Sequence, residues 1–207
     1  METYTTEEQQ VEAIKRFWRE NGISIVVGVV AGLAGVGGYN YYQEETVKAQ
    51  EAQSVAYNEV VESISPEKAE SFIKANSDSG YAELAALMLA KTFAEESEYA
   101  KAEKQLAWVV ANADKVEIKA LANYRLARVL VAQDKSDDAL AITNQTFPAA
   151  FEARVDELKG DIYLQKGEND KARDAYQAAA DNGGLNGNPV LQMKLDDLAV
   201  NSQLVAS

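Results

Sequence analysis

Histidine and cysteine are both absent from this 207-residue chain. Without an imidazole or a thiol, the chain has no cysteine nucleophile, no histidine for acid–base catalysis, and neither of the two side chains that most often bind zinc. Adjacent carboxylates occur, as at Glu95 and Glu96, but they fall in apparent turns among many other acids. No P-loop, EF-hand or serine-hydrolase motif is present. We therefore expect a protein that is not an enzyme and that uses no cofactor and no metal.

Proline is rare, and glycine is unevenly distributed. The chain has three prolines, and six of its twelve glycines lie between Asn21 and Gln43. Residues that interrupt helices and strands are therefore scarce elsewhere, whereas alanine, glutamate and lysine, which favour helices, are abundant. The sequence predicts an all-α protein.

Acidic residues dominate the charge, with 33 Asp and Glu against 20 Lys and Arg and a net charge of −13. Such a chain is repelled by phosphate groups, so nucleic acid is not an expected partner and neither is an anionic lipid surface for the folded domain. A solvated, soluble surface is the simplest explanation of this charge.

One segment, from Asn21 to Gln43, carries no charge. Within it, Ile23 to Tyr42 covers about 30 Å as a helix, which is the thickness of a hydrocarbon core. Basic residues precede the segment and acidic residues follow it, which predicts a cytoplasmic N-terminus by the positive-inside rule (Lys15, Arg16 and Arg19; Glu44 and Glu45). We expect a cytoplasmic segment over 1–21, a transmembrane helix over 22–43 and an outward-facing domain over 44–207. A cleaved signal peptide is the alternative.

Small residues form a ridge along the predicted membrane helix. Gly28 and Gly32 make a G-x-x-x-G step, with Ala31 and Gly35 beside it, a spacing that lets a second helix approach closely. The alternative is that membrane helices simply tolerate glycine. The leader before the span predicts a short amphipathic helix, which either orients the span or contacts a cytoplasmic protein.

Helix signals continue beyond the membrane segment. Ser65 followed by Pro66 is a typical helix start, and Pro148 breaks a later helical run. We expect helix pairs at about 46–76, 81–112, 117–146 and 152–180, followed by a capping helix at 189–203.

The pairs repeat, and the last pair shows the pattern best. Gly160 and Tyr163 lie on its first helix, Gly167 in the turn, and Ala172 and Tyr176 on its second. Small residues recur 33 and 70 residues earlier, at Ala127 and Ala90. This pattern resembles the tetratricopeptide repeat, and a plain helical bundle is the alternative. Lys159 and Thr143 depart from the pattern, since the repeat prefers large apolar residues at both positions.

The repeat spacing also predicts a concave protein-binding groove, lined by the first helix of each pair. The residues expected to face it are Leu87, Lys91, Tyr124, Arg128, Val131, Asp161 and Leu164. Each of these side chains has an alternative place in the packing between helices or in solvent.

The order of these parts resembles the YfgM family of ancillary SecYEG translocon subunits. The resemblance is carried by the segments Gln10–Phe17 and Leu126–Val129 and by the spacing of Gly160 from Lys166 and Gly167. It covers essentially the whole chain, from the leader through the glycine-rich span to the repeats.

The resemblance implies a protein of the bacterial inner membrane with its repeat domain in the periplasm. It implies association with the SecYEG translocon and with the membrane-anchored chaperone PpiD, and a scaffold role in passing emerging secretory polypeptides to periplasmic chaperones. An alternative function that it implies is regulation of an envelope-stress response, through contact between the cytoplasmic leader and a response regulator.

Overall fold

The computed structural model describes residues 7–63 and 65–205, with side chains described as far as residue 198. All regular elements within these residues are helices, as the sequence predicts. The chain divides into two compact units, residues 1–53 and residues 54–207, which are described separately.

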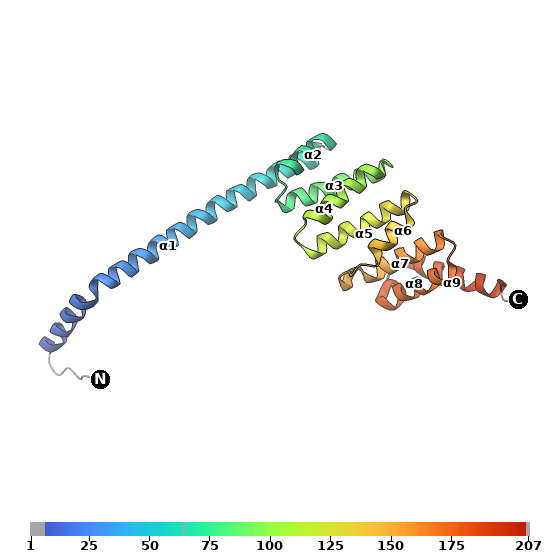
Figure 1. Ribbon diagram of the computed structural model, residues 1–207. Coiled ribbons are helices and arrows are strands. Elements are labelled where there is room, and N and C mark those ends of the chain that lie inside the picture. The colour runs from blue at the N-terminus through green and yellow to red at the C-terminus, as the bar shows by residue number, and fades with distance from the viewer. Residues whose placement is uncertain (1–6, 64, 206–207) are drawn as a thin grey trace. The chain divides into compact units, whose positions relative to one another are not determined.

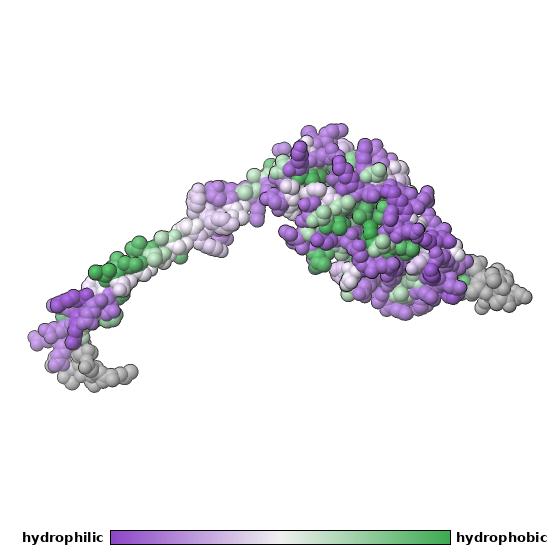
Figure 2. Space-filling view, in the orientation of Figure 1, coloured by the Kyte–Doolittle hydropathy of each residue, from purple (hydrophilic) through white to green (hydrophobic). Residues whose placement is uncertain are grey.

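The first unit consists of the N-terminal part of α1 (Glu7–Ser63) (Figure 1). Leader, span and the run from Thr46 to Ser63 therefore belong to one helix, with no break at Asn21; residues 1–6 of the leader lie outside the described part. The central part of α1 is long and apolar enough to cross a membrane, and Figure 2 shows it as a green band. Among residues 7–63 and 65–205, one helix is therefore a candidate membrane span, and the predicted limits at 22 and 43 remain a prediction.

The second unit contains the end of α1 followed by a series of shorter helices. The helices are α2 (Pro66–Ala75), α3 (Gly80–Glu95), α4 (Tyr99–Asn112), α5 (Val116–Ala132), α6 (Ser136–Thr143), α7 (Ala149–Gln165), α8 (Asn169–Ala179), the π-helical segment η1 (Ala180–Gly184) and α9 (Pro189–Val205).

The start of α2 has the predicted cap. The Ser65 hydroxyl accepts a hydrogen bond from the backbone N–H of Lys68 at 3.3 Å, and Pro66 occupies the first helical position, where no N–H is needed. Tyr57 of α1 stacks at an angle against Phe72 of α2 and Tyr81 of α3, with ring centroids 6.3 and 5.5 Å away. These aromatic contacts join the end of α1 to the helices that follow it.

Helices α3 to α8 form three antiparallel pairs that stack in sequence order (Figure 1). Each helix packs on the next one in the chain, and the first helices of successive pairs also touch, α3 with α5 and α5 with α7. This is the arrangement of a tetratricopeptide-repeat-like solenoid rather than of a plain bundle. The predicted fold class is confirmed.

Small residues lie where the two helices of a pair cross. Ala90, Ala127 and Gly160, which the repeat spacing aligns, are all buried on the first helices. The aligned positions on the second helices, which hold Leu106, Thr143 and Tyr176, are also fully buried. Thr143 is accommodated because its hydroxyl donates a hydrogen bond to the Leu140 carbonyl at 3.2 Å.

The turns inside the three pairs share one geometry. Ser97, Asp134 and Gly167 have φ of 62°, 60° and 75°, in the left-handed region that favours glycine. In each turn the next residue's N–H bonds to a carbonyl five residues back, as from Glu168 to Tyr163 at 2.9 Å. This is the Schellman motif, and it ends α3, α5 and α7 alike.

Charged side chains connect neighbouring pairs. Glu103 on α4 accepts hydrogen bonds from Lys135 and Gln133 in the following pair, each at 2.8 Å. These two hydrogen bonds lower the pKa of the Glu103 carboxyl. Lys166 in the last pair likewise forms an ion pair with Asp137 on α6. The same kind of link therefore recurs at both junctions.

The last helix, α9, packs against the last helix pair. Leu191 of α9 is fully buried beside α8, and Lys194 forms ion pairs with Glu157 and Asp161 of α7 at 2.8 and 2.6 Å. Burial alone lowers the pKa of Lys194, but the hydrogen bonds to the two carboxylates outweigh it and raise the pKa above the ordinary lysine value.

Candidate protein-binding cleft

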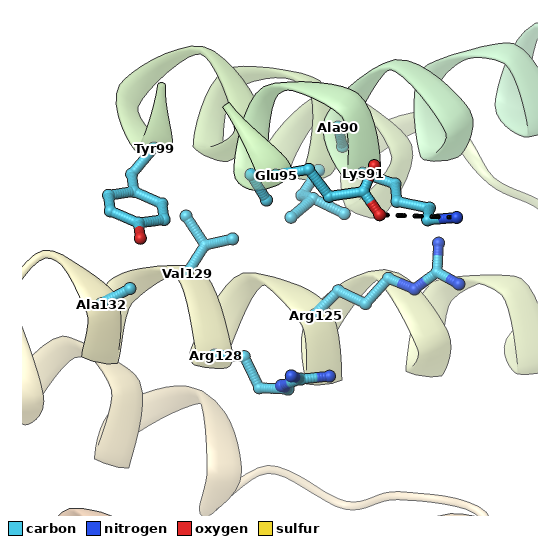
Figure 3. Close-up of a pocket in the computed structure, with 10 residues that line it drawn as sticks. Ala90, Lys91, Glu95, Tyr99, Arg125, Arg128, Val129 and Ala132 are labelled. Carbon is cyan, nitrogen blue, oxygen red and sulfur yellow. Dashed lines mark ion pairs between the residues drawn. The ribbon is translucent and has the colours of Figure 1, made fainter. Parts of the chain in front are cut away.

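A cleft of about 510 Å³ lies between the first helices of two successive pairs, α3 and α5, with α4 behind them (Figure 3). Its floor is apolar and built mostly from small side chains, because alanine at the helix crossings leaves room above the core. The floor residues are Ala90, Ala94, Leu106, Val129 and Ala132.

The rim of this cleft is cationic at one end. Lys91 of α3 and Arg125 of α5 extend to the same end, and Arg128 follows one turn later on α5 (Figure 3). Lys91 forms an ion pair with Glu95 at 3.6 Å, in which both side chains are about two-thirds exposed. Tyr99 lies at the opposite end of the cleft (Figure 3).

The two arginines of the cleft are held by different contacts. The Arg125 guanidinium donates a hydrogen bond to the backbone carbonyl of Leu87 at 3.5 Å, which ties α5 to α3. The Arg128 guanidinium lies 5.9 Å from the centroid of the Tyr124 ring, a cation–π distance, and its side chain is exposed. Both positions follow from the helical period, which places residues three apart on one face.

The charge of the cleft is opposite to that of the chain. Of the residues that the structure describes as lining it, Lys91, Arg125 and Arg128 are basic and Glu95 is the one acid. The whole chain carries a net charge of −13. An excess of positive charge over an apolar floor can attract and desolvate a negatively charged, partly apolar ligand.

The predicted groove residues are distributed over several environments. Lys91 and Arg128 line the cleft, and Tyr124 lies under Arg128. Leu87 is 5% exposed and belongs to the core, where it presents its carbonyl to Arg125, and Val131 is half-buried against the same core. That these residues contact a polypeptide remains a prediction.

The other two predicted groove residues lie on α7, apart from the lining of this cleft. Asp161 accepts a hydrogen bond from the Tyr176 hydroxyl at 2.7 Å and forms an ion pair with Lys194. Burial first, and then the hydrogen bond to Asp161, raises the pKa of Tyr176 well above its usual value. Leu164 is 43% exposed.

Sequence reasoning missed Arg125, Glu95 and Tyr99. The signal for Arg125 was present, because it precedes Arg128 by three residues and so shares its face of the helix. Tyr99 was not predictable from the groove rule, since it belongs to the second helix of its pair. Glu95 lines the cleft because it lies one helical turn after Lys91 and so shares its face of α3, where the two side chains form an ion pair.

A second candidate surface lies on α1. The ridge residues Gly28, Ala31, Gly32 and Gly35 are exposed, and a Cβ added at any of the three glycines would have no atom within 4 Å. This surface can therefore take another helix against its backbone. In residues 7–63 and 65–205, no group of acidic side chains is placed to hold a metal ion.

Comparison with known proteins gives one consistent result. Residues 15–200 match a family model described as a tetratricopeptide repeat-like domain. An ancillary SecYEG translocon subunit of Escherichia coli (strain K12) is 34% identical, over 97% of this chain and 100% of that protein. Proteins of the same description from Neisseria gonorrhoeae and Haemophilus influenzae are 32% and 29% identical, over 96% and 93% of this chain and 100% and 97% of theirs. No solved structure matches the chain.

Proposed function

The chain belongs to the YfgM family of ancillary SecYEG translocon subunits, and we propose on this basis that it is a membrane-anchored, non-enzymatic scaffold that associates with the translocon. The observation that carries the proposal is the extent of the likeness. It runs over 97% of the chain, so that the apolar part of α1 and the repeat domain are both included.

The proposed topology is a single span of the bacterial inner membrane with the repeat domain in the periplasm. Its support is the charge difference across the apolar segment, with Lys15, Arg16 and Arg19 before it and Glu44 and Glu45 after it. The domain then faces the side of the membrane on which secretory polypeptides emerge.

The proposed contact with the translocon is the ridge of Gly28, Ala31, Gly32 and Gly35. Its support is that the backbone along this ridge is open, which permits close packing of helices in a membrane. Val26 and Val30 lie on the opposite face of the same helix, because each is two residues, or about 200°, from a ridge glycine.

The proposed work of the domain is to bind emerging secretory polypeptides and to help pass them to periplasmic chaperones, with PpiD as a partner. Its support is the family resemblance together with the open cleft between α3 and α5. A solenoid suits this task because it presents an extended surface instead of an enclosed site.

Photo-crosslinking in living cells tests the proposal. A photoreactive amino acid replaces Gly32 on the ridge or, as the matched control, Val30 on the opposite face. We expect crosslinks to translocon subunits from position 32 and far fewer from position 30. Finding none from either position, while the protein is inserted at its normal level, would contradict the proposed association.

A second function rests on the leader. Val11, Ile14, Phe17 and Trp18 are 49–68% exposed on α1, and Lys15, Arg16 and Arg19 lie among them. Exposed apolar residues at helical spacing can bind a cytoplasmic protein such as a response regulator. Deleting residues 2–14 tests this, and an unchanged envelope-stress reporter would exclude it.

A further inference from the structure

The geometry points to a ligand class for the cleft between α3 and α5: we propose that it binds an extended polypeptide segment in which a carboxylate is flanked by small or medium apolar side chains. The inference rests on the proposed scaffold function and makes it more specific. Its carboxylate binds beside the basic residues of the lining, with Lys91 and Arg125 at one end and Arg128 one turn later on α5, and its apolar side chains lie on the floor toward Tyr99 (Figure 3).

The first argument is unmatched positive charge. Lys91 has Glu95 as its partner at 3.6 Å, in an exposed and therefore weak ion pair. Arg125 is hydrogen-bonded to a neutral carbonyl, and Arg128 lies over an aromatic ring, so the contacts described for these two arginines leave their charge uncompensated. Arginine binds carboxylates through two parallel hydrogen bonds, which suits both side chains to a carboxylate ligand.

The second argument is the shape and chemistry of the floor. A cleft of about 510 Å³ lies in the usual size range of ligand sites, roughly 300–1,000 Å³. Ala90, Ala94 and Ala132 leave space that larger side chains would fill, and Leu106 and Val129 give that space an apolar base. Medium-sized apolar side chains fit such a floor better than bare phosphate or sugar does.

The third argument is the charge around the cleft. A strongly acidic chain repels nucleic acid and anionic membranes over long distances, whereas a single carboxylate experiences mainly its nearest cations. The ligand that satisfies both the acidic surroundings and the cationic cleft is therefore a polypeptide with isolated acidic residues. The same acidic surroundings disfavour a polyanion.

The test compares two fluorescent peptides that differ only in one side-chain group, a carboxylate in one and a carboxamide in the other. Both are short, unstructured and made of alanine, valine and leucine around one central residue, which is aspartate in one and asparagine in the other, with both ends blocked. Binding to the full chain in detergent micelles is followed by fluorescence anisotropy. We expect the aspartate peptide to bind about tenfold more tightly than the asparagine peptide, with an advantage that shrinks as salt is added.

Variants locate the site. Arg128→Gln removes an exposed charge of the cleft, and Lys119→Gln is the matched control because Lys119 is exposed on the same helix and is not among the lining residues. We expect Arg128→Gln to remove most of the preference for aspartate and Lys119→Gln to preserve it. Circular dichroism checks that both variants are folded.

Several results would overturn the inference. Three results would each exclude carboxylate recognition in this cleft: equal binding of the two peptides, no binding of either peptide, or an equal loss of the preference for aspartate in both variants. Self-association of the chain that is abolished by Arg128→Gln would assign the cleft to a second copy instead. None of these results would affect crosslinking from position 32, so failure of this inference is distinguishable from failure of the proposed function.

Discussion

Gly160 of α7 and Tyr176 of α8 pack so closely that a Cβ added to Gly160 would lie 2.3 Å from the Tyr176 ring. The ring is fully buried, and its hydroxyl donates a hydrogen bond to Asp161 at 2.7 Å. The aligned positions of the first pair hold Ala90 and Leu106. There the second helix carries leucine in place of the larger tyrosine, and the first helix carries alanine in place of the smaller glycine. The last pair crosses around a tyrosine, and only glycine leaves room for it.

This contact predicts the effect of Gly160→Ala. The added methyl group overlaps the ring and forces α7 and α8 apart, which we expect to lower the free energy of unfolding by about 1–3 kcal/mol. Thermal unfolding of the detergent-solubilised protein, followed by circular dichroism, measures the loss.

The double variant Gly160→Ala with Tyr176→Leu copies the combination found at Ala90 and Leu106. We expect it to be more stable than Gly160→Ala alone, because leucine makes room for the methyl group. Additive losses from the two changes would show that the ring does not limit how closely the helices approach.

The Schellman turns predict opposite effects of glycine and alanine. Ser97 has φ of 62°, a conformation that costs a residue with a side chain roughly 1–2 kcal/mol, so Ser97→Gly should stabilise the fold by a few tenths of a kcal/mol after the flexibility of glycine is counted. Gly167→Ala should destabilise it by about 1 kcal/mol. Chemical denaturation of both variants checks the signs, and effects of the same sign would contradict the shared geometry.

Much of the repeat domain was predictable, because each helix carries local signals. Pro66 after Ser65, the breaker Pro148 and the spacing of Gly160 from Gly167 and Tyr176 gave the helices and their pairing. The turns at Ser97 and Asp134 were not recognisable in the same way, because the left-handed residue there is not glycine and the conformation is imposed by the helices on either side.

The cleft was only partly predictable. Helical spacing identified Lys91 and Arg128, but it could not tell that Leu87 is buried, because the helix face that meets the next pair depends on how the pairs stack. The link between Arg125 and the Leu87 carbonyl joins residues 38 positions apart. Contacts of this kind arise from the packing of whole helices and leave no local pattern in the sequence.

The link between pairs at Glu103 predicts a dependence on pH. Hydrogen bonds from Lys135 and Gln133 lower the Glu103 pKa in the folded state, so the stabilisation is complete above the ordinary glutamate value of 4.5 and is lost as the pH falls through the lowered pKa. Glu103→Gln should therefore cost about 0.5 kcal/mol at neutral pH, a modest value because both partners are partly exposed, and less at pH near 3.

Unfolding of Glu103→Gln and of the parent protein by denaturant at the two pH values measures this difference. Glu62→Gln, which removes an exposed carboxylate from α1, is measured in parallel as the control. A difference between Glu103→Gln and the parent that grows on acidification would have the wrong sign for a lowered pKa.

The absence of cysteine makes the proposed topology simple to test. Single cysteines introduced by Glu8→Cys in the leader and Lys119→Cys in the repeat domain are exposed on their helices. In intact spheroplasts, a membrane-impermeant maleimide should label position 119 and leave position 8 unlabelled until the membrane is opened. Labelling of position 8 alone in intact spheroplasts would indicate the opposite topology. Labelling of both positions would contradict the proposed membrane span.

The central claim is association with the SecYEG translocon, and its most direct test is isolation of the full-length protein from membranes of its own organism in a mild detergent. Mass spectrometry then measures the translocon subunits that accompany it. Gly28→Leu with Gly32→Leu blocks the ridge, and Val26→Leu with Val30→Leu is the matched control. We predict that translocon subunits accompany the parent protein and the valine variant and are depleted with the glycine variant. Their absence from the intact, membrane-inserted parent protein would contradict the account.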